Sequence, residues 1–201
     1  MSDHIVSSFD EELNEITGGL INMGALVLAA LRSVEEILKN NDHNLAQKII
    51  DNDLQINDLG QSIEIKAFNT LASRQPMAYD LRLVFSAVKM SLYLERCGDM
   101  CKGISKRILK GDLTKAAPNT IESLVNLTNR VHENLSLVLE DYAARTSEKS
   151  LEVWSSDSEI DSIYSDILME ILNNIKSKPE AIEALVPLFF IARSLERVGD
   201  H

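Results

Sequence analysis

The chain contains the stretch Leu94-Glu95-Arg96-Cys97-Gly98-Asp99, and 101 residues later it contains Leu195-Glu196-Arg197-Val198-Gly199-Asp200. Five of the six letters are identical. An earlier pair of stretches, Asp53-Leu54-Gln55-Ile56-Asn57 and Asp157-Ser158-Glu159-Ile160-Asp161, recurs at an offset of 104. Two signatures that return in the same order at nearly the same spacing indicate an internal duplication, so we expect two copies of one structural unit.

The apolar periodicity predicts what that unit is. Between residues 3 and 39, apolar side chains recur at steps of three and four, as on one face of a helix. The same pattern, interrupted at Asn, Gly and Pro, predicts six helices at about residues 3–39, 42–73, 77–109, 118–145, 148–176 and 179–201. Short connections make neighbouring helices antiparallel. We therefore predict an all-α fold, a tandem duplication of a three-helix antiparallel bundle with domains at residues 1–112 and 113–201, the last helix being cut short.

The composition favours helix and excludes several classes of function. Gly (8) and Pro (4) are scarce, and aromatic residues make up 5% of the 201 residues. The net charge of −11, without a run of Lys and Arg, is atypical of a nucleic-acid binder and of a protein that adsorbs to anionic lipid. We see no signal peptide and no apolar run of the roughly 20 residues that cross a bilayer, and we expect a cytoplasmic protein.

The acids of the two signatures are predicted to meet. If each helical hairpin folds at its proline, Asp53 lies level with Asp99, and Asn57 lies level with Glu95. The second copy repeats this arrangement. Each set is expected to continue an inward-facing apolar stripe, with Leu81, Val84, Phe85, Val88 and Leu92 in the first copy. Hard cations prefer such oxygen ligands. The predicted metal ligands are Asp53, Asn57, Glu95, Asp99, Asp157, Asp161, Glu196 and Asp200.

Other interpretations of these residues remain open at this point. Acids four apart on a helix are often solvated, and Arg96 and Arg197 could pair with them. Cys97 and Cys101 project to a second apolar face, which favours reduced core thiols over a thiolate metal site. His201 follows Asp200 and could assist the second site.

Two further interpretations concern an oxidase site of the ferritin type and the role of the motif glycines. A ferritin-type site needs Glu three residues before His, and the sequence has no such pair. The motif glycines Gly98 and Gly199 lie within helices, where a small residue would allow a second helix or a metal cluster to approach closely.

The run from Arg74 to Arg82, Arg-Gln-Pro-Met-Ala-Tyr-Asp-Leu-Arg, together with both Leu-Glu-Arg-x-Gly-Asp motifs, resembles the signature of the PhoU family. The resemblance covers essentially the whole chain. It implies a pair of three-helix bundles that bind divalent or multinuclear metal (iron, manganese, magnesium or zinc) through the acidic motifs, and it implies a homodimer or higher oligomer. Three departures stand out: Asn57 replaces a preferred acid, Met100 follows Asp99, and the last helix stops at its motif.

The resemblance also implies a function. Such proteins are negative regulators of the phosphate regulon and of phosphate uptake, and they link the ATPase subunit of the phosphate ABC transporter to a membrane sensor histidine kinase. The chain would reach the membrane only through these partner proteins. A metal-dependent enzyme or a metal buffer is the alternative, although no catalytic motif supports an enzyme.

Overall fold

The computed structural model describes residues 2–111, 113, 118–155 and 157–201, with the side chains of residues 2–8 and of Asp157 outside that description. The described residues form helices and no strand. The first three helices are α1 (Ser2–Asn40), α2 (His43–Arg74) and α3 (Ala78–Lys110). They are followed by α4 (Pro118–Ala144), α5 (Glu148–Ser155), α6 (Asp157–Ser177), the 3₁₀ turn η2 (Pro179–Ala181) and α7 (Ile182–Asp200). The predicted all-α architecture is confirmed.

Local sequence accounts for where the helices of the first bundle begin and end. The Asp42 carboxylate caps α2 by accepting hydrogen bonds from the backbone N–H groups of Asn44 and Leu45. Helix α2 ends at Gln75, which adopts the left-handed conformation with φ of 49°. Pro76 lies in the connection to α3, because Met77 is the N-cap of that helix. The sequence therefore places this turn within two residues.

The predicted fifth helix is covered in the structure by α5 and α6, and residue 156 between them lies outside the described residues. Helix α5 has no buried residue, but it packs against α4, where the Ser150 backbone N–H donates a hydrogen bond of 2.6 Å to Asp141 Oδ2.

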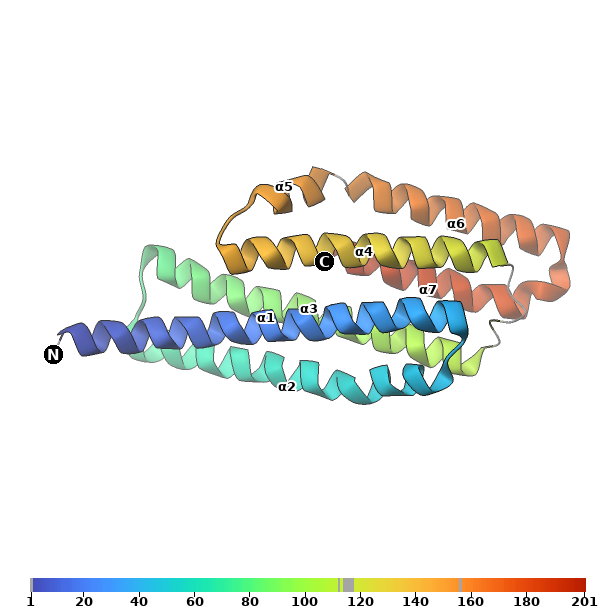
Figure 1. Ribbon diagram of the computed structural model, residues 1–201. Helices are drawn as coiled ribbons and strands as arrows, with labels where there is room; N and C mark the ends of the chain where they lie inside the picture. Colours follow the sequence, from blue (N-terminus) through green and yellow to red (C-terminus); the bar gives the residue numbers. More distant parts are fainter. Residues whose placement is uncertain (1, 112, 114–117, 156) are drawn as a thin grey trace.

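The two bundles lie side by side, with α1 against α4 and α3 against α7 (Figure 1). One continuous hydrophobic cluster runs through both, from Ile16 in α1 to Leu195 in α7. Gly24 permits the contact between α1 and α4, since a Cβ there would lie 2.7 Å from both methyl carbons of Leu139. The duplicated units therefore share one core rather than forming two separate ones.

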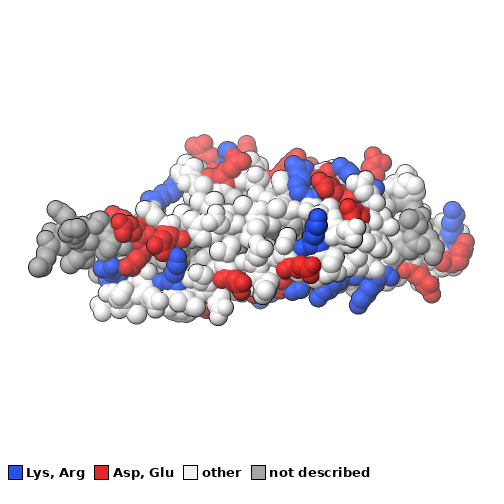
Figure 2. Space-filling model, turned by 60° about the horizontal axis from the view of Figure 1, so that its bottom comes forward, with Lys and Arg blue, Asp and Glu red and all other residues white. Residues whose placement is uncertain are grey.

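Helix α1 is apolar enough to be mistaken for a membrane span. The segment Phe9–Asn40 satisfies the length and hydropathy of a spanning helix. However, its residues Leu20, Met23, Val27 and Leu31 have no exposed surface and form the centre of the core. Packing inside the bundle thus accounts for the apolar character of α1. On the face drawn in Figure 2, acidic and basic side chains lie in small interspersed groups around a broad uncharged area.

Candidate metal centre

The first acidic motif is assembled by α2 and α3 around Asp53. This residue is only 3% exposed. Its Oδ2 accepts hydrogen bonds from Lys102 Nζ at 2.5 Å and from Asn57 Nδ2 at 3.3 Å. Lys102 Nζ also lies 3.6 Å from Asp99 Oδ1. Asp53 and Asp99 thus lie at the same level of the bundle, as their equal distances from Pro76 predict, and one ammonium group contacts both.

The packing of the motif glycines brings α2 and α3 together at this level. A Cβ on Gly98 would lie 2.9 Å from Ile56 Cδ1 and 3.6 Å from Asp53 Oδ1. In the second copy, a Cβ on Gly199 would lie 3.0 Å from Ile160 Cδ1. Glycine therefore allows the same close approach of a neighbouring helix in both copies, which is the reason we expected for a small residue at this position.

Two oxygens of the first site are buried without a partner. Asp53 Oδ1 and Asn57 Oδ1 are inaccessible to solvent and accept no hydrogen bond. A buried oxygen without a donor costs roughly 1–3 kcal/mol, and more when it carries charge. A hard cation would satisfy both oxygens, so the donor set of the first site fits such an ion.

The second motif centres on Glu196 in α7. Glu196 is 7% exposed, and its Oε1 accepts a hydrogen bond of 2.7 Å from Arg193 Nη1. Its Oε2 is buried and has no partner. Burial raises the pKa of Glu196 above its usual value, and the negative charges of Asp200 and Asp161 add to the rise. The two neighbouring acids are exposed, so they can turn toward a cation. These groups also fit a hard cation, while the side chain of Asp157 lies outside the described residues.

The structure brings these groups near one another without closing a coordination sphere. Among the described residues, no group of three or more His, Cys, Asp or Glu side chains is arranged to hold a metal. In the first copy, Glu95 Oε2 lies 3.4 Å from where a Cβ on Gly60 would be. Glu95 is half-buried and Asp99 is exposed, so ligation would require both side chains to turn. The eight predicted ligands therefore remain a prediction.

The expected orientation of the α3 stripe is wrong for three of its five residues. Leu81, Phe85 and Leu92 are 45%, 60% and 49% exposed. Val84 is buried as expected, and the buried stripe continues through Ala87, Leu94, Cys97 and Cys101. The acids of the motif therefore continue the outer edge of α3, where ions can reach them, rather than the innermost face.

The structure also shows the surroundings of the two cysteines, the two motif arginines and His201. Cys97 and Cys101 are free, buried thiols, as the helical wheel predicts. Neither Arg96 nor Arg197 makes an ion pair with an acid in the described part of the chain, where Lys102 and Arg193 contact the motif acids instead. His201 stacks on Tyr93 of α3 with ring centroids 5.6 Å apart. None of these side chains replaces the acids as the candidate site.

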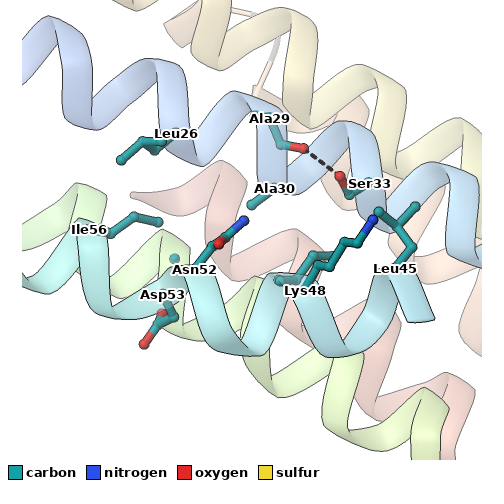
Figure 3. A pocket seen from close by; sticks show the side chains of 11 residues that line it. Leu26, Ala29, Ala30, Ser33, Leu45, Lys48, Asn52, Asp53 and Ile56 are labelled. Atoms are coloured by element: carbon teal, nitrogen blue, oxygen red, sulfur yellow. Dashed lines mark hydrogen bonds between the residues drawn. The ribbon is translucent and has the colours of Figure 1, made fainter. Parts of the chain in front are cut away.

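A small cavity that the sequence did not predict lies beside Asp53. It has a volume of about 140 Å³ and lies between α1 and α2, with Leu26 and Ala30 on one side and Ile56 on the other. Asn52 points across it toward α1, whereas the Asp53 carboxylate turns away from α1 (Figure 3). Because several of its apolar lining residues are spread over two helices, no single stretch of sequence predicts it.

These features define a class: all-helical proteins built from a duplicated bundle that presents an acidic motif at the same level of each copy. The PhoU domain model matches residues 20–108 and again residues 124–201. The chain belongs to the PhoU family, and the suspected resemblance is confirmed. Members of this family are accessory and regulatory proteins, so the prediction that the chain is not an enzyme is also confirmed.

Named relatives match along nearly the whole chain. The phosphate-specific transport system accessory protein PhoU homolog of Caulobacter vibrioides strain NA1000 / CB15N is 38% identical over 203 residues, which cover 100% of this chain and 87% of the relative. The homolog of Rhizobium meliloti strain 1021 is 36% identical, over 98% of this chain and 84% of the relative.

Two solved structures share the fold. The crystal structure of PhoU from Pseudomonas aeruginosa matches with a TM-score of 0.92 at 30% identity, over 96% of this chain and 92% of that one. The phosphate transport system regulatory protein PhoU from Streptococcus pneumoniae matches with a TM-score of 0.88 at 29% identity, over 96% of this chain and 90% of that one. The arrangement of bundles described above is therefore the arrangement of this family.

Proposed function

We propose that this chain is a cytoplasmic accessory protein of a phosphate transport system that represses the phosphate regulon and phosphate uptake when phosphate is plentiful. Its partners would be the ATPase subunit of the phosphate ABC transporter and a membrane sensor histidine kinase, and it would act as a homodimer or higher oligomer. Family membership over nearly the full chain supports this proposal, because the relatives carry names of accessory and regulatory proteins of phosphate transport.

We also propose that the duplicated acidic motifs bind divalent metal. The observation that carries this proposal is that three of the buried oxygens without partners, Asp53 Oδ1, Asn57 Oδ1 and Glu196 Oε2, belong to the two acidic motifs. Asp53, Asn57, Glu95 and Asp99 would hold the ion in the first copy. In the second copy the ligands would be Asp157, Asp161, Glu196 and Asp200. A bound cation would neutralise acids whose mutual repulsion otherwise opposes the folded state.

The regulatory proposal is tested by measuring alkaline phosphatase activity in phosphate-replete cells with and without the gene. We expect high constitutive activity after deletion and repression when the intact gene is restored. Activity that stays repressed after deletion would contradict the regulatory role in this organism.

The metal proposal needs a separate measurement, since regulation could survive without metal. Purified protein is analysed for iron, manganese, magnesium and zinc, and its unfolding temperature is measured with and without added Mn²⁺ or Fe²⁺. We expect Asp99→Asn combined with Asp200→Asn to lose most of the metal-dependent stabilisation. Asp58→Asn combined with Asp166→Asn changes the same charge on exposed acids outside the motifs and should keep it. Equal stabilisation of both pairs would overturn the metal assignment.

A further inference from the structure

A polar cavity, separate from the cavity beside Asp53, lies between α3 and α7, where the two bundles meet. Its volume is about 340 Å³, and three of its lining residues are arginines, Arg96, Arg107 and Arg197. Ser194 and Asp99 also line it. Arg96 and Arg197 hold the same position in the two copies of the duplicated motif. The cavity is therefore built by the duplication itself, with one motif arginine from each half of the chain.

None of the three guanidinium groups forms an ion pair with a carboxylate of the described residues, although Arg197 lies near enough to Glu196 for its charge to oppose the rise in that carboxyl's pKa. Within residues 9–111, 118–155 and 158–201, no Asp or Glu lies within ion-pair distance of Arg96, Arg107 or Arg197. The nearby motif acids have other cationic partners, since Asp99 lies near Lys102 and Glu196 accepts a hydrogen bond from Arg193. In a chain with a net charge of −11, three unpaired arginines around one cavity are an unusual concentration of positive charge.

Neighbouring groups lie against or near these side chains, of which Arg107 is half-buried and Arg96 and Arg197 are exposed. The Arg107 guanidinium lies over the ring of Phe190 in α7, 5.6 Å from its centroid. Gly103 leaves room for it, since a Cβ there would lie 3.1 Å from Arg107 Nη1. Arg96 and Arg197 both lie close enough to His201 for their charges, after burial, to lower the pKa of its imidazole. Because Arg107 is packed in this way, it loses less side-chain freedom when it binds a ligand.

We propose that this cavity binds a phosphoryl anion, either inorganic phosphate or the terminal phosphate of a small molecule. Planar guanidinium groups donate paired hydrogen bonds that match the spacing of phosphate oxygens, and a dianion removes the repulsion between three unpaired cations. The cavity carries three positive charges against the single carboxylate of Asp99, so its net charge suits a dianion. The site goes beyond the proposed regulatory function and needs no metal, although Asp99 belongs to both sites.

A bound anion would also join the two halves of the molecule. Arg96 and Arg107 belong to α3, and Arg197 belongs to α7. An oxyanion that contacts arginines of both helices strengthens the α3–α7 contact, and it would therefore raise the stability of the whole chain. Anion binding and stabilisation against unfolding should depend on the same arginines.

The test is calorimetric titration of the full chain after passage over a chelating resin, with inorganic phosphate in one arm and adenosine monophosphate in the other. We expect saturable binding of one anion per chain. Binding of phosphate assigns the free ion, and binding of the nucleotide alone assigns a phosphorylated small molecule; both support the site. Arg96→Gln combined with Arg197→Gln should weaken binding at least about tenfold, because each lost charged hydrogen bond contributes over 1 kcal/mol.

The matched control is Lys106→Gln combined with Lys110→Gln, which removes the same charge from exposed positions of α3 that do not line the cavity. Its affinity should change less than about threefold. Arg107→Gln alone should also weaken binding, and it provides a second variant if the double variant unfolds. Absence of saturable binding of both anions, or equal weakening by the arginine and lysine pairs, would overturn the proposal.

Discussion

The ammonium group of Lys102 lies 2.5 Å from Oδ2 of the buried Asp53, so it supplies positive charge to the same carboxylate that the proposed metal of the first copy would neutralise. We expect Lys102→Met to destabilise the metal-free protein, because it leaves a buried charge without its partner. The loss should be about 2 kcal/mol, below the 3–5 kcal/mol of a fully buried pair, since the Lys102 side chain is 27% exposed. Chemical denaturation of metal-free protein measures it.

The same change should strengthen metal binding in the first copy. Metal no longer has to displace an ammonium group, so added Mn²⁺ should restore more stability to Lys102→Met than to the unaltered chain. Lys106→Met, on the exposed side of the same helix, is the control and should behave like the unaltered chain. A variant that is destabilised but gains nothing from metal would show that Lys102 is only a structural partner of Asp53.

Glu196 gives a pH-dependent prediction for the second copy. Burial and the charge of Asp200 raise its pKa in the folded protein. The native state therefore binds more protons than the unfolded state above the unfolded pKa of about 4.3, and stability falls as pH rises from there through the folded pKa. Glu196→Gln removes this loss and can still accept the Arg193 hydrogen bond. We expect a higher unfolding temperature for the metal-free variant at pH 7.

The advantage of Glu196→Gln should shrink as the pH is lowered toward 4.3, because the native carboxyl group is then protonated. Thermal unfolding at a series of pH values measures it, with each kcal/mol worth roughly 2–4 °C for a chain of this size. Glu180→Gln, on an exposed residue of η2, should show no such pH-dependent gain. A constant difference at every pH would mean that the carboxyl group of Glu196 titrates normally.

The sequence predicts the helices and their order well, because periodicity and the breaks at Asn41, Pro76 and Gly111 are local properties. The duplicated motif predicts the level at which Asp53 and Asp99 meet, since an antiparallel hairpin fixes that level from residue counts alone. These inferences need only the geometry of one hairpin.

The orientation of α3 could not be predicted in the same way. Two apolar stripes lie on that helix, one with Leu81 and Phe85 and the other with Cys97 and Cys101. A helical wheel shows both but does not say which one meets α1 and α2. Small side chains decide the matter, since Ala87 and Gly98 allow close packing while Phe85 does not. The arginine cavity could not be predicted for a related reason. Arg197 of α7 meets Arg96 and Arg107 of α3 only because the two bundles pack against each other.

The contact between α1 and α4 gives a prediction about the shared core. Gly24→Ala would place a methyl group 2.7 Å from both Leu139 methyl carbons, so the Leu139 side chain would have to shift and the surrounding core would have to repack. Overpacking costs about 1–3 kcal/mol, and the better helix propensity of Ala returns about 1 kcal/mol. We expect a net loss of about 1 kcal/mol in urea unfolding.

Gly18→Ala is the matched control on the same helix, because a Cβ there meets nothing within 4 Å. Only the gain in helix propensity remains, so this variant should be more stable by up to about 1 kcal/mol. If Gly24→Ala were as stable as Gly18→Ala, the bundles would not pack as closely as the structure has them.

The buried thiols of α3 give a prediction about reactivity. Burial raises the pKa of Cys97 to about 12. The pKa of Cys101 is raised still further, first by burial and then by the negative charges of the Cys97 thiolate and of Asp53. Since only the thiolate is nucleophilic, iodoacetamide at pH 8 should leave both cysteines unmodified in the folded protein and alkylate both in urea. Mass spectrometry measures the modification. Rapid alkylation of Cys97 without urea would mean that α3 opens locally at the motif, since unfolding of the whole chain would expose Cys101 equally.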